Sequence, residues 1–128
     1  MHLNNRTQLK KFIGSIFKAE KRNLDSLNYV FSSDKKLREI NRKYLKHDFY
    51  TDIITFDLSE NRSEIKGEVY ISVDRVKDNS RALNEYFSKE LLRVIFHGVL
   101  HLCGYNDKTS HQIKEMRDRE NLYLKKYQ

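Results

Sequence analysis

The chain contains the segment Leu91-Leu-Arg-Val-Ile-Phe-His97-Gly-Val-Leu-His101-Leu-Cys-Gly104-Tyr-Asn-Asp107, which is apolar on nearly every side and predicts a buried helix. On a helix, His97 and His101 share one face, the arrangement that lets two imidazoles bind one metal ion, most often zinc. Gly104 can end the helix in the left-handed conformation, and the returning chain can bring Asp107 to the same ion. The spacing is that of a catalytic metal site with three protein ligands and an open fourth position.

Other interpretations of this segment are weaker. Two core histidines bonded to nearby backbone would need no metal, and for a bare His-x-x-x-His we would favour that interpretation. Gly104 and Asp107 at the matching offsets favour a metal site instead. Cys103 lies two residues after His101, about 200° around the helix, and is interpreted as a small apolar core residue rather than a ligand. A zinc peptidase is disfavoured because Gly98 stands where that class carries its glutamate general base.

Two further blocks accompany the histidine segment at sensible spacing. One is Asn41-Arg-Lys-Tyr44 followed by Thr51-Asp-Ile-Ile-Thr-Phe56, and the other is Gly67-Glu-Val-Tyr-Ile-Ser72. Together the three blocks resemble the YbeY family and cover most of residues 37–107. The resemblance implies a bacterial zinc-dependent, single-strand-specific endoribonuclease that acts in 16S rRNA 3′-end maturation and ribosome quality control. Its expected partners are single-stranded RNA, 16S rRNA and the small ribosomal subunit, with one Zn²⁺ per chain held by His97, His101 and Asp107.

Two positions depart from the family pattern. The family usually has a third histidine where this chain has Asp107, and a carboxylate donates more charge to a metal than a neutral imidazole does. We therefore expect an activity optimum displaced toward higher pH. The family often has an arginine after the tyrosine of its Asn-x-x-Tyr block, where this chain has Leu45. Arg42, Lys43 and Lys46 are the candidate RNA contacts nearby; Lys46 is the nearest substitute for phosphate contact, although a solvated helix-end lysine explains it at least as well.

Composition agrees with an RNA-facing protein without proving it. The chain of 128 residues has a net charge of +7 and a sequence pI near 9.5, which favours polyanionic partners. Residues 34–46 hold six Lys and Arg against two acids, whereas residues 52–68 hold five acids against two bases. The length suits a single domain, residues 1–128. One cysteine, no signal peptide and no apolar stretch of membrane-spanning length predict a cytoplasmic protein. The oligomeric state is left open.

The apolar periodicity predicts an α+β fold: a small mixed β-sheet packed with about five helices, with the metal site on a buried helix and the following loop. Helices are expected at residues 5–20, 74–84, 85–103 and 110–127, with one more after a cap at Ser33 or Asp34. Strands are expected at residues 24–32, 52–58 and 67–73, the last two forming a hairpin around residues 60–64. The expected apolar positions of the capped helix are Leu37, Ile40, Tyr44 and Leu45. Those of the last helix are Ile113, Met116, Leu122 and Leu124.

Several further side chains receive provisional roles. The family resemblance places the strand beginning at Thr51 opposite the metal, so Thr51 and Asp52 are candidates for binding substrate or for stabilising the fold. A helix- or turn-capping role explains Asp52 equally well. Tyr105 is a candidate for stacking on unpaired bases. His47 lies in a loop and has either a role in RNA contact or none, and the interpretation as a solvated loop histidine is favoured. His111 is left outside the metal site because Gly104-Tyr-Asn predicts a turn.

The catalytic groups stay open at this point. No residue in the motif is an evident general base, so the nucleophile is either metal-bound water or the 2′-hydroxyl of the RNA. The alternative function is a non-catalytic RNA-binding ribosome-assembly protein whose zinc is structural. The open fourth position argues against that alternative, and Leu45 in place of arginine argues for it.

Overall fold

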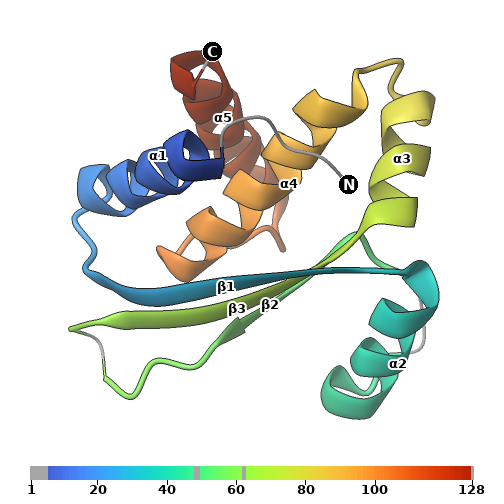
Figure 1. Cartoon of the computed structure of the whole chain (residues 1–128), viewed down its shortest axis with the longest axis horizontal. Coiled ribbons are helices and arrows are strands. Elements are labelled where there is room, and N and C mark those ends of the chain that lie inside the picture. The colour runs from blue at the N-terminus through green and yellow to red at the C-terminus, as the bar shows by residue number, and fades with distance from the viewer. Residues whose placement is uncertain (1–5, 48–49, 62, 128) are drawn as a thin grey trace.

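The computed structural model describes residues 6–47, 50–61 and 63–127 and has an α+β architecture in this part of the chain (Figure 1). Its elements follow the order α1 Arg6–Ala19, β1 Leu24–Ser32, α2 Asp34–Leu45, β2 Ile53–Asp57, β3 Ile65–Ser72, α3 Val73–Ala82, α4 Phe87–Leu102 and α5 Ser110–Tyr127. The expected fold class is confirmed, and strand β1 and helix α5 have the expected bounds. None of the helices in the described ranges is long and apolar enough to cross a membrane.

The sheet is mixed and has the strand order β1-β3-β2. Strand β3 pairs in parallel with β1 and antiparallel with β2, so Val69 lies between Tyr29 and Thr55. The β2–β3 pair is the expected hairpin, although residue 62 of its turn lies outside the described residues. The order leaves β2 at one edge of the sheet, and this edge forms part of the cleft described below.

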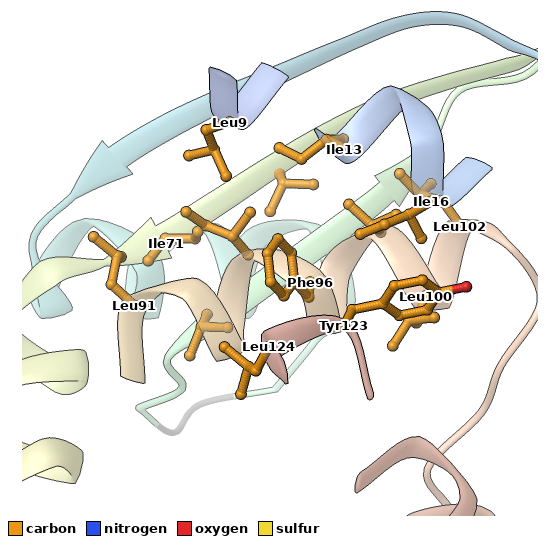
Figure 2. Close-up of a cluster of buried hydrophobic side chains, with 14 of the residues drawn as sticks. Leu9, Ile13, Ile16, Ile71, Leu91, Phe96, Leu100, Leu102, Tyr123 and Leu124 are labelled. Carbon is orange, nitrogen blue, oxygen red and sulfur yellow. The ribbon is translucent and has the colours of Figure 1, made fainter. Parts of the chain in front are cut away.

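The main core lies between the sheet and helices α1, α4 and α5, which cover the same face of the sheet in Figure 1. Helix α4 is central to this core. Figure 2 shows its Phe96 and Leu100 among Ile13 of α1, Ile71 of β3 and Tyr123 of α5. Full burial of each such side chain stabilises the folded state by about 1.5–3 kcal/mol. Helix α4 is therefore held in place by α1, α5 and the sheet.

Two glycines let α4 approach the sheet. A Cβ on Gly67 of β3 would lie 2.5 Å from Leu102 Cδ1, closer than atoms can pack. A Cβ on Gly98 of α4 would lie 3.0 Å from Ile53 Cδ1 and 3.3 Å from Val69 Cγ1. The face of α4 that carries Gly98 therefore packs against β2 and β3. Gly98 thus has a packing role, in addition to standing where zinc peptidases carry a glutamate.

Helix α2 packs on the opposite face of the sheet, in a small cluster formed by Leu37, Ile40 and Ile54. Ser33 is its N-cap, because the Ser33 hydroxyl accepts a hydrogen bond from the Lys36 backbone amide at 3.2 Å. Tyr44 and Leu45 were expected on the apolar face, and this is wrong: they are 62% and 43% exposed. The cluster on this face of the sheet is small, and neither side chain belongs to it.

The buried face of α5 also differs from expectation. Met116 and Leu124 are buried as expected, but Ile113 and Leu122 are 52% and 37% exposed. Their places on the buried face are taken by Tyr123 and Glu120, and Glu120 is only 4% exposed. A buried carboxylate needs partners, and those of Glu120 lie at the metal-ligand candidates of α4.

Candidate metal centre

Helix α4 carries His97 and His101 one turn apart, with ring centroids separated by 4.5 Å. The helix ends directly after them at Leu102, and Gly104 follows with φ +108°. The Gly104 amide donates to the His101 carbonyl and the Tyr105 amide donates to the Leu100 carbonyl, both at 3.0 Å. This pair of bonds is the Schellman motif, which needs a residue of positive φ and so explains the glycine.

The loop after Gly104 returns Asp107 to the two imidazoles. Asp107 Oδ2 lies 3.3 Å from His97 Nε2 and 3.4 Å from His101 Nε2. One atom from each of the three residues lies within 4.8 Å of the others, as a shared metal ion requires. Ligands about 2.0–2.1 Å from one ion at tetrahedral angles lie ~3.3–3.4 Å apart, so the carboxylate-to-imidazole spacings fit a tetrahedral site.

The Nδ1 atom of each histidine has its own acceptor. His97 Nδ1 donates to Glu120 Oε2 at 2.6 Å, and His101 Nδ1 donates to the Tyr105 carbonyl at 2.9 Å. An acceptor at Nδ1 fixes the tautomer, so in the neutral ring the lone pair is on Nε2. Both Nε2 atoms face Asp107, and the ring orientations therefore prepare them to bind a metal.

Glu120 is the partner that the sequence analysis missed. Its other oxygen, Oε1, lies 3.3 Å from Arg93 Nη1 and 3.8 Å from Arg117 Nη1, so the buried charge is compensated. The residue shares the buried face of α5 with Met116, four residues earlier. A carboxylate on a buried helical face is the signal that would have indicated it, because such a group requires a charged or hydrogen-bonding partner.

The two imidazoles titrate differently when no metal is bound. Burial lowers the pKa of His97, but the hydrogen bond and charge of Glu120, with the charges of Asp107 and Asp52, outweigh burial and raise this pKa above its ordinary value. Burial and the neighbouring His97 lower the pKa of His101, against the opposing charge of Asp107. Protons therefore compete with a metal mainly at His97.

The loop that carries Asp107 is fixed to the end of α1 and to α5. The Tyr105 hydroxyl donates to Glu20 Oε1 at 2.7 Å, and the Tyr123 hydroxyl donates to the other oxygen of the same carboxylate. Arg22 Nη1 donates to the Cys103 carbonyl at 3.0 Å. Cys103 itself packs beside the core, and burial raises the pKa of its thiol to about 12, as for an inert side chain rather than a ligand.

A cleft of about 410 Å³ opens in front of the three candidate ligands. One wall, the α4 wall, consists of the end of α4 and the loop after it. The other wall, the α2–β2 wall, consists of the end of α2, the residues His47, Thr51 and Asp52, and strand β2. The lining residues are His97, His101, Leu102 and Asp107 on the α4 wall, and Asn41, Leu45, His47, Thr51, Asp52, Ile53, Ile54, Thr55 and Asp57 on the α2–β2 wall. We call this space the metal cleft.

Asp52 lines the metal cleft and also stabilises the fold around it. Its carboxylate accepts a hydrogen bond from Asn79 Nδ2 of α3 at 3.4 Å, and its backbone carbonyl accepts one from the Ser72 amide at 2.9 Å. Burial raises the pKa of the Asp52 carboxyl, partly offset by the nearby His97. Thr51 lines the cleft as well, and its hydroxyl donates to the Ile53 carbonyl at 3.2 Å.

The remaining candidate residues divide between the cleft and the surface. Arg42, Lys43 and Lys46 are exposed at the end of α2, and none of them is among the described residues that line the cleft. His47, for which the sequence analysis favoured a solvated loop position, is exposed and also lines the cleft. Tyr105 is half-buried by its contacts with Glu20 and Arg119, so its expected role in base stacking stays a prediction. His111 lies on α5, apart from the three candidate ligands.

Comparison with known proteins agrees with this geometry. The family model described as Endoribonuclease YbeY matches residues 2–128. The chain is 46% identical over 122 residues to an Endoribonuclease YbeY of Cytophaga hutchinsonii, covering 95% of this chain and 85% of that protein. It is 40% identical over 119 residues to one of Flavobacterium johnsoniae, covering 93% and 85%. A solution structure from Thermotoga maritima superposes with a TM-score of 0.65 at 30% identity, covering 98% of this chain and 85% of that one.

Proposed function

The chain belongs to the Endoribonuclease YbeY family, and from this premise we propose that it is a zinc-dependent, single-strand-specific endoribonuclease acting in 16S rRNA 3′-end maturation and ribosome quality control. Residues 1–128 act as one domain in this proposal, in the cytoplasm where ribosomes are assembled. The observation that carries it is the convergence of His97 Nε2, His101 Nε2 and Asp107 Oδ2 on one point of an open cleft.

The donor set supports zinc as the ion. Two imidazole nitrogens and one carboxylate oxygen are borderline-hard ligands that suit Zn²⁺, and three protein ligands leave the fourth position open for chemistry. When bound, the ion would acidify water and polarise a phosphoryl oxygen. The chain's own residues hold the ligands for it: Glu120 and the Tyr105 carbonyl orient the two imidazoles, and the contacts of Glu20 and Arg22 position the Asp107 loop.

The shape and charge around the metal cleft support an unpaired RNA strand as substrate. A volume of about 410 Å³ is that of a small-ligand site, which admits an extruded nucleotide but not a duplex. Arg42, Lys43 and Lys46 lie exposed at the end of α2, beside the cleft-lining residues Leu45 and His47. Their positive charges would attract and position the phosphates on either side of the nucleotide, independently of sequence.

The absence of a glutamate after His97 supports phosphodiester rather than peptide chemistry. In zinc peptidases that glutamate moves a proton at the metal, and here the position is Gly98, which packs against Ile53 and Val69. A longer side chain at Gly98 would meet the sheet before it reached a substrate. Proton transfer must therefore come from the opposite wall of the cleft or from the RNA itself.

Metal content and RNA cleavage, measured on one preparation, test the proposal. We expect about one zinc per chain, cleavage of single-stranded RNA and of the 16S 3′ region in ribosomal particles, and no cleavage of a duplex of the same sequence. His97→Ala should lose both zinc and cleavage, whereas His111→Ala, a control on the exposed face of α5, should keep both. Zinc retained with no cleavage of free RNA or particles would contradict the proposal and favour a ribosome-assembly protein with a structural zinc.

A further inference from the structure

The metal cleft is poor in groups that can deliver a proton. Its described lining residues include the carboxylates Asp52, Asp57 and Asp107 but no lysine or arginine. The imidazoles of His97 and His101 are committed at both nitrogens, with Nδ1 bonded to Glu120 or the Tyr105 carbonyl and Nε2 facing Asp107. Breaking an RNA phosphodiester leaves a strongly basic alkoxide, which departs readily only when it receives a proton.

His47 is the third histidine that lines this cleft within the described part of the chain, and it is not among the candidate metal ligands. Its position follows from the end of α2. Lys46 has φ 57°, and this left-handed residue reverses the chain so that Leu45 and His47 line the cleft while Lys46 does not. The backbone amides of Lys46 and His47 both donate to the carbonyl of Asn41, the latter at 3.1 Å.

The anchor of His47 is itself well fixed. Asn41 is only 2% exposed and lies on α2 next to the buried Ile40. The backbone at residue 47 is thus held by a helix that packs on the sheet, and His47 lines the cleft on the wall opposite the candidate metal ligands. An imidazole can both donate and accept a proton near neutral pH, which an exposed lysine or arginine cannot.

We propose that His47 is a catalytic residue that donates a proton to the leaving 5′-oxygen when the RNA phosphodiester is cleaved. This inference rests on the proposed endoribonuclease function. In the step, an oxygen of water or of the RNA 2′-hydroxyl loses its proton to solvent and forms a bond to phosphorus, while the bond from phosphorus to the 5′-oxygen breaks. The electron pair of the broken bond stays on the 5′-oxygen, which takes the imidazolium proton. The neutral imidazole then regains a proton from solvent.

Asp52 is the competing proton donor on the same wall. Its carboxyl is less exposed than His47, and it accepts a hydrogen bond from Asn79 while its backbone is paired to Ser72. These contacts fix Asp52 against α3 and β3, and the exposed His47 lines the same wall. The two residues make different predictions for a substrate whose leaving group needs no proton.

The test compares two RNA oligonucleotides of one sequence, an ordinary one and one with sulfur in place of the scissile 5′-oxygen. A thiolate leaves without protonation, so loss of a general acid costs little on this substrate. His47→Gln should cleave ordinary RNA about 100-fold more slowly than the parent and the sulfur-containing RNA within a few-fold of it. Zinc content and affinity should be unchanged. His111→Gln, a matched control away from the cleft, should behave as the parent on both substrates.

Three results would overturn the inference while the endoribonuclease function stands. One is an equal loss by His47→Gln on both substrates, and another is loss of zinc by that variant. The third is rescue by sulfur in Asp52→Asn instead, which would assign the proton to Asp52. A parent protein that holds zinc but cleaves neither RNA would overturn the proposed function, and the role of His47 with it.

Discussion

The two walls of the metal cleft differ in how they are built. The α4 wall is rigid and specified locally: its helix is buried on three sides, and the Schellman motif at Gly104 returns the chain to the helix that it left. The α2–β2 wall is assembled from the exposed end of a helix, three described residues between that helix and the next strand, and an edge strand. The difference teaches that one wall is suited to hold an ion and the other to meet a flexible substrate. Mutations in the two walls should therefore differ in kind as well as in size.

The largest effect should come from removing a ligand on the α4 wall. His101→Ala deletes one of the three converging atoms, so we expect more than ~100-fold loss of zinc affinity, beyond the upper end for partners outside the ligand set. Single-stranded RNA cleavage should fall to background. Chelator competition and a cleavage assay measure the two quantities. Parental zinc affinity in this variant would show that the α4 wall does not hold the ion.

The next largest effect should come from changing Glu120, the buried carboxylate that accepts a hydrogen bond from His97. Glu120→Gln keeps an oxygen that can accept from His97 Nδ1 but removes the charge, so zinc affinity at pH 8 should fall about 10- to 100-fold. Glu120 also raises the pKa of His97, and protons compete with zinc below that pKa. The acid edge of zinc binding should therefore move to lower pH in the variant. Zinc titrations at several pH values measure the zinc affinity and the pH at which binding is lost. Glu115→Gln, on the exposed face of α5, is the control.

The rigidity of the α4 wall can be tested through stability. Gly67→Ala places a Cβ 2.5 Å from Leu102 Cδ1, next to the candidate ligand His101, and should lower the free energy of unfolding by about 1–3 kcal/mol. Gly14→Ala in α1 adds a Cβ with nothing within 4 Å and should raise it by about 0.5–1 kcal/mol. Urea unfolding measures both. Equal effects of the two variants would mean that α4 does not approach the sheet closely.

The smallest effect should come from the exposed end of α2. Lys46→Ala removes one candidate phosphate contact outside the cleft, so RNA affinity should fall roughly two- to five-fold for all sequences, with the salt slope of binding reduced by about one. Zinc affinity should not change. Binding measured at several salt concentrations checks this. A loss of cleavage as large as that of His101→Ala would remove the distinction between the two walls.

The same contrast explains what the sequence could and could not predict. The α4 wall depends on local spacing: His97 and His101 one turn apart, a glycine where φ is positive, and Asp107 shortly after. Those features were readable without a structure, as were the hairpin and the bounds of β1 and α5. Glu120 lies 23 residues from His97, and no local rule connects the two.

The α2–β2 wall was harder to predict because its side chains take their roles from tertiary packing. Tyr44 and Leu45 have the spacing of an apolar face, but the small cluster on that face of the sheet leaves both exposed. His47 is exposed, as expected of a solvated loop histidine, but it also lines the cleft. Sequence spacing does not indicate that position, because it depends on the left-handed conformation of Lys46, a residue other than glycine. Lys46 was the nearest candidate for phosphate contact, beside an interpretation as a solvated lysine that fits at least as well, and its role stays a prediction.

The central claim is that Asp107 completes a zinc site with His97 and His101. Zinc affinity and the pH profile of RNA cleavage should be measured together for the parent, Asp107→Ala and Asp107→His. The account predicts that alanine abolishes tight zinc binding and cleavage, whereas histidine retains both and shifts the profile to lower pH, because a neutral imidazole donates less charge to the ion. Parental zinc binding and cleavage in Asp107→Ala would contradict the account directly.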